Sequence, residues 1–159
     1  MFTVLFRVDS SPQVGLGHLM RCLALADALK NYKVKSLFVI AGDELTSKAI
    51  ILKRKHSVIF ISSLCTNEEL VFLNRIIENE SPGAVVLDGY NFNYDYQKKL
   101  NTKGAPLVCL GWSSDYRTAA DLVVNQNIWA SPGLYAGQIQ PGATLLLGTK
   151  YALLPQDYH

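Results

Sequence analysis

The chain has 159 residues, of which 49% are hydrophobic and 18% are charged, and its formal net charge is +2 at pH 7. This length supports one compact domain with its own core and is too short for two domains of ordinary size. The basic residues are scattered, and their densest cluster, residues 53–56, falls where a helix is expected to end. The charge pattern therefore argues against a nucleic-acid-binding or membrane-surface protein.

The three cysteines, Cys22, Cys65 and Cys109, lie far apart and form no Cys-x-x-Cys pair. They are typical of reduced core residues in a cytoplasmic protein, not of a disulfide framework or a zinc site. The N-terminus lacks the basic start and long apolar stretch of a signal peptide, and no apolar run is long enough to cross a membrane. We therefore expect a cytoplasmic location.

The strongest functional pattern lies where the first strand leads into the first helix. A turn with Gly15 and Gly17 precedes a helix whose first side chains include His18 and Arg21. Glycines let the backbone turn tightly and approach a ligand, and the opening turn of a helix presents unpaired N–H groups that favour anions. A dinucleotide fingerprint would require glycine where Met20 stands. The loop is therefore Rossmann-like in architecture but lacks the nicotinamide and flavin signature.

His18 is the candidate catalytic residue. A neutral imidazole at the start of a helix can accept a proton, and it can orient or deprotonate a water molecule. The alternative is a histidine that merely fills a position near the start of a helix. Both interpretations stay open on the residues alone.

Short apolar runs alternate with helical stretches along the chain. Strands are expected at residues 3–8, 34–40, 58–61, 84–88, 106–110 and 122–124, with a further strand within 143–155. Helices are expected over residues 19–32, from 41–43 to about 53, from Thr66 towards Glu80 and near 95–101. This alternation predicts an α/β domain: a Rossmann-like parallel sheet with helices on both faces.

Ligands of such sheets bind beyond the carboxyl ends of the strands. Polar residues follow several of the expected strands: Asp9 after the first, Asp43 after the second, Asp88 and Tyr90 after the fourth, and Asn125 after the sixth. We expect these residues to share one rim. The three aspartates lie on separate strands without a recognised ligand spacing, so no metal is predicted, and no cofactor is expected.

Two parts of the chain differ in character near its end. Residues 1–148 are predicted to form the Rossmann-like domain. Residues 149–159 begin apolar and end in Pro155-Gln156-Asp157-Tyr158-His159, which is more typical of a linker that leads to a second domain than of a polar tail.

Four stretches carry a resemblance to a known family. They are residues 6–11 with 15–26, then 86–90, 121–127 and 147–154. In this order, and across nearly the whole chain, they resemble the UDP-sugar hydrolases of pseudaminic acid biosynthesis and their relatives among the spore coat polysaccharide biosynthesis proteins. One departure is the segment 110–115, Leu-Gly-Trp-Ser-Ser-Asp, where the family usually carries an acidic pair.

The resemblance implies the N-terminal half of a glycosyltransferase-B-like enzyme built from two Rossmann-like domains. In that family, water attacks the anomeric carbon of a UDP-linked diacetamido trideoxy sugar and UDP is released. The resemblance implies that His18 acts on the water and that Tyr90 lines the same cleft. The expected partners are the UDP-linked amino sugar and a C-terminal nucleotide-binding domain, in the full-length protein or on another chain. Alone, the chain is expected to be nearly inactive.

The chemistry of the residues present allows several roles for the neighbours of His18. Asp9 orients either the His18 ring or a sugar hydroxyl, or else it caps a turn. Arg21 pairs with Asp9 or holds the diphosphate, or else it is a solvated helix arginine. Asp88 and Tyr90 either bind the sugar or merely cap the rim. The residues expected to bind substrate are Asp9, Gly15, Gly17, Arg21, Asp88, Tyr90 and Asn125.

Two other functions compete with hydrolysis. In a glycosyltransferase of the same architecture, His18 would deprotonate a sugar hydroxyl in place of water. In a non-catalytic binding or assembly module, the fold would remain while another subunit performs the chemistry.

Overall fold

The computed structural model describes residues 2–10, 16–42, 44–61, 66–111 and 117–155. Along the chain the elements are β1 (Thr3–Ser10), α1 (Gly17–Lys30), β2 (Lys35–Gly42), α2 (Glu44–Lys53), β3 (Ser57–Ile61), α3 (Asn67–Glu80), β4 (Ala84–Asp88), α4 (Tyr94–Lys99), β5 (Leu107–Leu110), β6 (Leu122–Asn125), η1 (Pro132–Tyr135), β7 (Thr144–Leu147) and η2 (Thr149–Tyr151). Each expected strand and helix is present, with its ends shifted by a few residues. The Thr66 side chain caps α3 by accepting from the Glu69 N–H.

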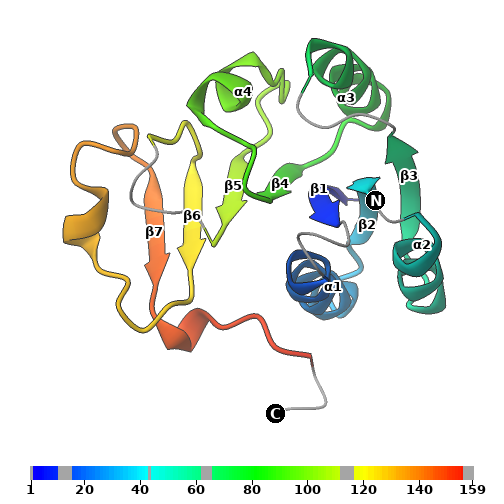
Figure 1. Cartoon of the computed structure of the whole chain (residues 1–159), viewed down its shortest axis with the longest axis horizontal. Coiled ribbons are helices and arrows are strands. Elements are labelled where there is room, and N and C mark those ends of the chain that lie inside the picture. Colours follow the sequence, from blue (N-terminus) through cyan, green and yellow to red (C-terminus); the bar gives the residue numbers. More distant parts are fainter. Residues whose placement is uncertain (1, 11–15, 43, 62–65, 112–116, 156–159) are drawn as a thin grey trace.

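Within the described residues, the seven strands form one sheet in the order β3-β2-β1-β4-β5-β6-β7, and each neighbouring pair is parallel (Figure 1). The predicted parallel α/β sheet is confirmed. Helices α1 and α2 cover one face, and α3 and α4 cover the other (Figure 1). The strand order reverses between β1 and β4, so the carboxyl ends of these two strands flank the position where open α/β sheets bind ligands.

Two hydrophobic cores lie on the two faces of the sheet, and β1 contributes to both. Phe6 and Val8 pack towards α1, whereas Leu5 packs towards α3. Because successive side chains of a strand point to opposite faces, this alternation also determines which polar side chains of β1 can meet which helix.

Both cysteines within the described residues, Cys22 and Cys109, are buried free thiols, as expected, while Cys65 lies outside those residues. None of the described helices is both long and apolar enough to span a membrane.

An ion-pair network lies beneath α3 and α4. Arg7 is fully buried; its Nε donates to Glu69 Oε1 at 2.7 Å and its Nη1 donates to Asp9 Oδ1 at 2.8 Å. The Tyr96 hydroxyl donates to the same Glu69 oxygen at 2.6 Å. Burial opposes the charge of Arg7, but the hydrogen bond to Glu69 and the charges of Asp9 and Glu69 raise its pKa, so the guanidinium stays protonated.

A second network lies at the amino ends of the strands. The Asp27 carboxylate pairs with Lys30 at 2.7 Å, with Arg54 at 2.6 Å and with His56 at 2.9 Å. Burial acts to raise the pKa of Asp27, but these hydrogen bonds lower it overall. This network ties the end of α1 to the segment between α2 and β3.

The buried ion pair makes Glu69 important for stability. Replacing Glu69 with Ala leaves the Arg7 guanidinium buried with one carboxylate fewer, so the free energy of unfolding should fall by about 3–5 kcal/mol. The exposed neighbour Glu68 is the matched control, and Glu68→Ala should change that free energy by less than about 0.5 kcal/mol. Urea unfolding of both variants measures the difference, and equal effects would contradict the role given to the pair.

Candidate functional site

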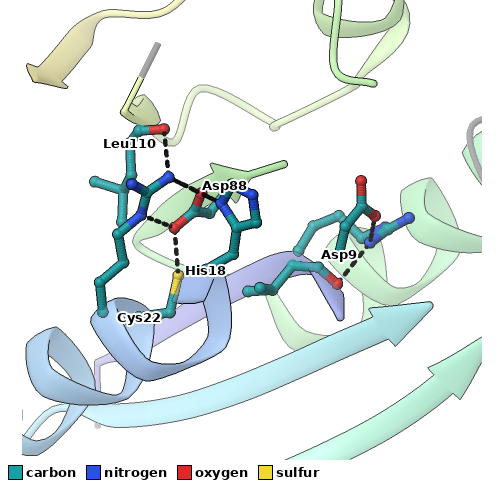
Figure 2. A network of polar contacts seen from close by, with 8 residues as sticks. Asp9, His18, Cys22, Asp88 and Leu110 are labelled. Carbon is teal, nitrogen blue, oxygen red and sulfur yellow. Dashed lines mark hydrogen bonds and ion pairs between the residues drawn. The ribbon is translucent and has the colours of Figure 1, made fainter. Parts of the chain in front are cut away.

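The site is built on the first turns of α1, which follow the end of β1. Arg21 and Cys22 follow His18 by three and four residues, so both lie on the same side of the helix as His18. All three side chains contact Asp88, the last residue of β4 (Figure 2). The contacts therefore join α1 to β4, which lies directly beside β1 in the sheet.

Asp88 is completely buried and receives donors on both carboxylate oxygens. Oδ1 contacts His18 Nδ1 at 2.6 Å and accepts from Arg21 Nη2. Oδ2 accepts from Arg21 Nε at 2.5 Å and from Cys22 Sγ at 3.3 Å. The guanidinium thus binds the carboxylate through two nitrogens, which is the strongest arrangement of such a pair. It also reaches the Leu110 carbonyl at 3.4 Å.

These partners assign the His18 tautomer. A carboxylate and a guanidinium surround Nδ1, and only the carboxylate can accept a hydrogen bond, so Nδ1 carries the proton. When the ring is neutral, its lone pair is therefore on Nε2, which forms no hydrogen bond to another described residue. This is the arrangement of a histidine that is ready to accept a proton.

Tyr90 covers the imidazole from the solvent side. Its ring packs edge-on against His18, with centroids 4.8 Å apart and planes at 83°. The tyrosine side chain is 74% exposed while His18 is only 8% exposed. An exposed phenol in contact with the candidate base can meet a ligand and shield the base from bulk water.

Burial and charge determine the protonation states of the two supporting residues. Burial works against the charge of Arg21, but the hydrogen bond and charge of Asp88 raise its pKa above the usual value. Burial, and after it the charge of Asp88, raises the pKa of the Cys22 thiol well above its usual value. Arg21 is therefore a cation and Cys22 is a protonated donor.

Two glycines make room for this arrangement. A Cβ at Gly111 would lie 2.5 Å from Arg21 Nη2, and Gly111 has a φ of +63°. A Cβ at Gly89 would lie 2.5 Å from Asp9 Oδ2. Glycine at these two positions lets the backbone after β5 and β4 approach the polar side chains closely.

The structure corrects two expectations about Asp9. Asp88, not Asp9, orients the His18 ring, and Arg21 pairs with Asp88, not with Asp9. The reason is the alternation of β1: Asp9 faces α3 and α4, where it pairs with Arg7, while α1 lies on the opposite face. Arg21 is also not a solvated helix arginine, because its side chain is only 20% exposed.

Asp9 still lies at the carboxyl edge of the sheet. Its Oδ2 is buried and has no hydrogen-bond partner among the described residues. Burial raises the pKa of its carboxyl group, although Arg7 acts in the opposite direction. A buried acceptor without a donor carries a desolvation cost that no described residue offsets.

The other predicted residues are distributed as follows. Gly17 begins α1, and a Cβ there would meet nothing within 4 Å. Asn125 is buried; its Nδ2 donates to the Tyr135 hydroxyl at 2.7 Å, and its Oδ1 accepts from Asn127, so the structure does not bring it to His18. Gly15 and Asp43 lie outside the described residues. Among the described residues, no group of three His, Cys, Asp or Glu side chains is placed to hold a metal ion.

Sequence reasoning missed Cys22 and Gly111 as parts of the site and missed Arg7 as a buried cation. For Cys22 a signal was available, because it lies four residues after His18 on the same helix face. Nothing in the sequence around Gly111 indicates that it contacts Arg21, since the two residues come together only in the folded protein.

The contact at Gly111 gives a direct test of how Arg21 is held. Gly111→Ala should displace the guanidinium and lower the free energy of unfolding by roughly 1–3 kcal/mol more than a positive φ alone would cost. Gly104→Ala is the matched control, because Gly104 has a φ of +84° but open space around its Cβ position. Urea unfolding and the Arg21 Nε–H resonance measure both effects, and similar losses in the two variants would contradict the contact.

Comparisons with known proteins agree with the sequence resemblance. None of the protein-family models matches this chain. The chain is 26% identical over 157 residues to the UDP-2,4-diacetamido-2,4,6-trideoxy-beta-L-altropyranose hydrolase of Campylobacter jejuni, which covers 98% of the chain and 53% of that protein. The chain thus spans about half the length of this curated relative.

Solved structures show the same fold at low identity. The chain matches Staphylococcus aureus MnaA, solved with UDP, with a TM-score of 0.68 and 13% identity over 92% of this chain and 44% of that chain. It matches the UDP-GlcNAc 2-epimerase of Methanocaldococcus jannaschii with a TM-score of 0.63 and 12% identity, over 91% and 45%. For Acinetobacter baumannii MurG the TM-score is 0.59 with 12% identity, over 83% and 43%. The fold is therefore a glycosyltransferase-B-like Rossmann fold, and the resemblance to the UDP-sugar hydrolases is confirmed.

Proposed function

We propose that this chain is the catalytic, sugar-side part of an enzyme that hydrolyses a UDP-linked diacetamido trideoxy sugar in surface-sugar biosynthesis. The observation that carries the proposal is the His18–Asp88 pair at the carboxyl edge of the sheet. It occurs in a chain that is similar along 98% of its length to a hydrolase of such a substrate. The pair supplies an oriented base, which this reaction needs from the protein.

The proposed step is a direct displacement by water. The water oxygen forms a bond to the anomeric carbon while the bond from that carbon to the phosphate oxygen breaks, and UDP leaves with the electron pair. The water proton passes to Nε2 of His18, whose Nδ1–H stays on Asp88. The configuration at the anomeric carbon inverts, and the products are the free sugar, UDP and one proton. A nucleoside diphosphate is a good leaving group, so a strong general acid is not required.

Arg21 has a supporting role in this proposal. Its Nε and Nη2 are committed to Asp88, so it neutralises that carboxylate and leaves the diphosphate to other donors. The start of α1 is the candidate donor to the diphosphate. The N-cap residue Leu16 makes no side-chain cap, and the first turn carries no acidic residue. Free N–H groups at a helix start attract anions. Open space around the Cβ position of Gly17 is compatible with a ligand at that turn.

The uridine-binding part is proposed to lie outside these residues, in a domain that follows residues 149–159 or on another chain. This proposal is supported by the coverage, because the chain accounts for 53% of the similar hydrolase and 43–45% of the similar solved chains. Sequencing the codons after His159 tests it. A long reading frame with further strand and helix alternation supports the first arrangement, and an immediate stop codon supports the second.

The activity test measures UDP release from UDP-2,4-diacetamido-2,4,6-trideoxy sugar by the complete protein. His18→Ala should lower kcat by about 10²–10⁴-fold, the usual contribution of a general base. His56→Gln is the matched control, because His56 is also buried but pairs with Asp27 at the opposite edge of the sheet, so UDP release should be unchanged. Unchanged turnover in His18→Ala would remove the catalytic role and favour a binding or assembly module.

The same assay separates hydrolysis from glycosyl transfer. A hydrolase releases UDP with water alone, whereas UDP that appears only when a sugar acceptor is added would overturn hydrolysis and favour the transferase.

Asp88→Asn tests the orientation of the imidazole. An amide in place of this carboxylate has only one acceptor oxygen, so it cannot both accept from Arg21 and hold the Nδ1–H of His18 in the same way. We therefore expect kcat to fall by roughly 10²-fold or more while KM changes little. Circular dichroism checks that the variant is folded. Full activity in a folded Asp88→Asn protein would contradict the proposed pairing.

A further inference from the structure

We propose that Cys22 is a positioning residue: its thiol holds Asp88 in the orientation that locks the His18 tautomer. This inference rests on the function proposed above for His18. Nothing in that function requires a cysteine, and a buried thiol is ordinarily a small core residue. The contacts of Cys22 support a more specific role.

The thiol is placed to act as a donor. Cys22 is completely buried, and its Sγ lies 3.3 Å from Asp88 Oδ2. Burial raises the pKa of the thiol, so it keeps its proton and donates to the carboxylate. Asp88 is also completely buried, so bulk water has no access to replace a missing donor. Loss of the thiol would therefore leave Oδ2 with Arg21 Nε as its one donor among the described residues.

Cys22 and Arg21 hold the carboxylate in different ways. The guanidinium spans both oxygens through a long side chain with several rotatable bonds, so it can move together with the carboxylate. Cys22 has a single side-chain torsion and reaches Oδ2 from one turn after His18 on the same helix. The short side chain therefore fixes the distance between Asp88 and the backbone that also carries His18 (Figure 2).

A matched control for simple packing lies elsewhere in the chain. Cys109 is also a completely buried free thiol, but it lies in the core on the α3 and α4 side of the sheet. Its Sγ accepts from the Thr118 hydroxyl at 3.9 Å, and it makes no hydrogen bond to His18 or Asp88 among the described residues. Shortening either cysteine to alanine removes one sulfur from a core, but only Cys22→Ala removes a donor from Asp88.

The first measurement does not depend on catalysis. Long-range ¹⁵N–¹H spectra of the 159-residue chain report the His18 ring nitrogens, which are assigned by comparison with His18→Gln. The wild type should show the Nδ1–H tautomer. Cys22→Ala should shift both ring nitrogens towards the values of a mixture of tautomers, while Cys22→Ser, which retains a donor, and Cys109→Ala should keep the wild-type pattern. If Cys22→Ala does not fold, Cys22→Val fills the space without a donor and serves in its place.

The second measurement uses UDP release by the complete protein. Cys22→Ala should lower kcat about tenfold with little change in KM, and Cys22→Ser should restore most of that loss. Cys109→Ala should leave kcat unchanged even if thermal unfolding shows a similar loss of Tm. Equal effects of the two alanine variants on kcat, or an unchanged His18 tautomer in Cys22→Ala, would overturn the inference. Failure of the wild-type protein to release UDP would overturn the proposed function instead, and the ring-nitrogen spectra would still decide the role of Cys22.

Discussion

The carboxylate of Asp88 is the constraint on which the site depends. A charge that is fully removed from water must be matched by donors and by an opposite charge, or the fold does not tolerate it. Here Arg21 supplies the charge, and His18, Cys22 and Arg21 supply the donors, all from α1. The same requirement therefore fixes the start of α1 against the end of β4 and determines where the imidazole lies.

A second buried carboxylate lies close by but belongs to a different network. Asp9 and Asp88 lie near the carboxyl ends of neighbouring strands, yet strand alternation sends them to opposite faces, where Arg7 and Arg21 neutralise them separately. Arg21 neutralises Asp88, whereas Arg7 pairs with both Asp9 and Glu69, so Asp9 and Asp88 do not share a cation. The backbone of Gly89, which precedes Tyr90, lies very close to the Asp9 carboxylate. The position of Tyr90 is therefore linked to the Arg7–Asp9 ion pair, although that pair lies on the opposite face of the sheet from His18.

The order and type of the elements could be predicted because periodicity is local, and the parallel sheet followed from the alternation of strands with helices. The pairing within the site was only partly predictable. Sequence reasoning placed Asp88 on a shared rim but did not indicate its contact with His18. The interpretation in which Asp9 orients His18 ignored the alternation of β1, in which Val8 and Asp9 must face opposite ways. The role of Gly111 could not be predicted from the sequence. Position 111 requires glycine because the Arg21 guanidinium lies against it, and Arg21 is distant in the chain.

Every described contact that orients His18 comes from within this one domain: Asp88 from β4, Cys22 and Arg21 from α1, Leu110 from the end of β5 and Tyr90 from the segment after β4. In the proposed hydrolase, a base held in this way is preorganised before any other part of the enzyme closes over the substrate. Under that proposal, affinity for the nucleotide depends on residues elsewhere, while the rate of the chemical step depends on these contacts. Substitutions in this network should therefore change kcat and leave nucleotide affinity largely unaltered.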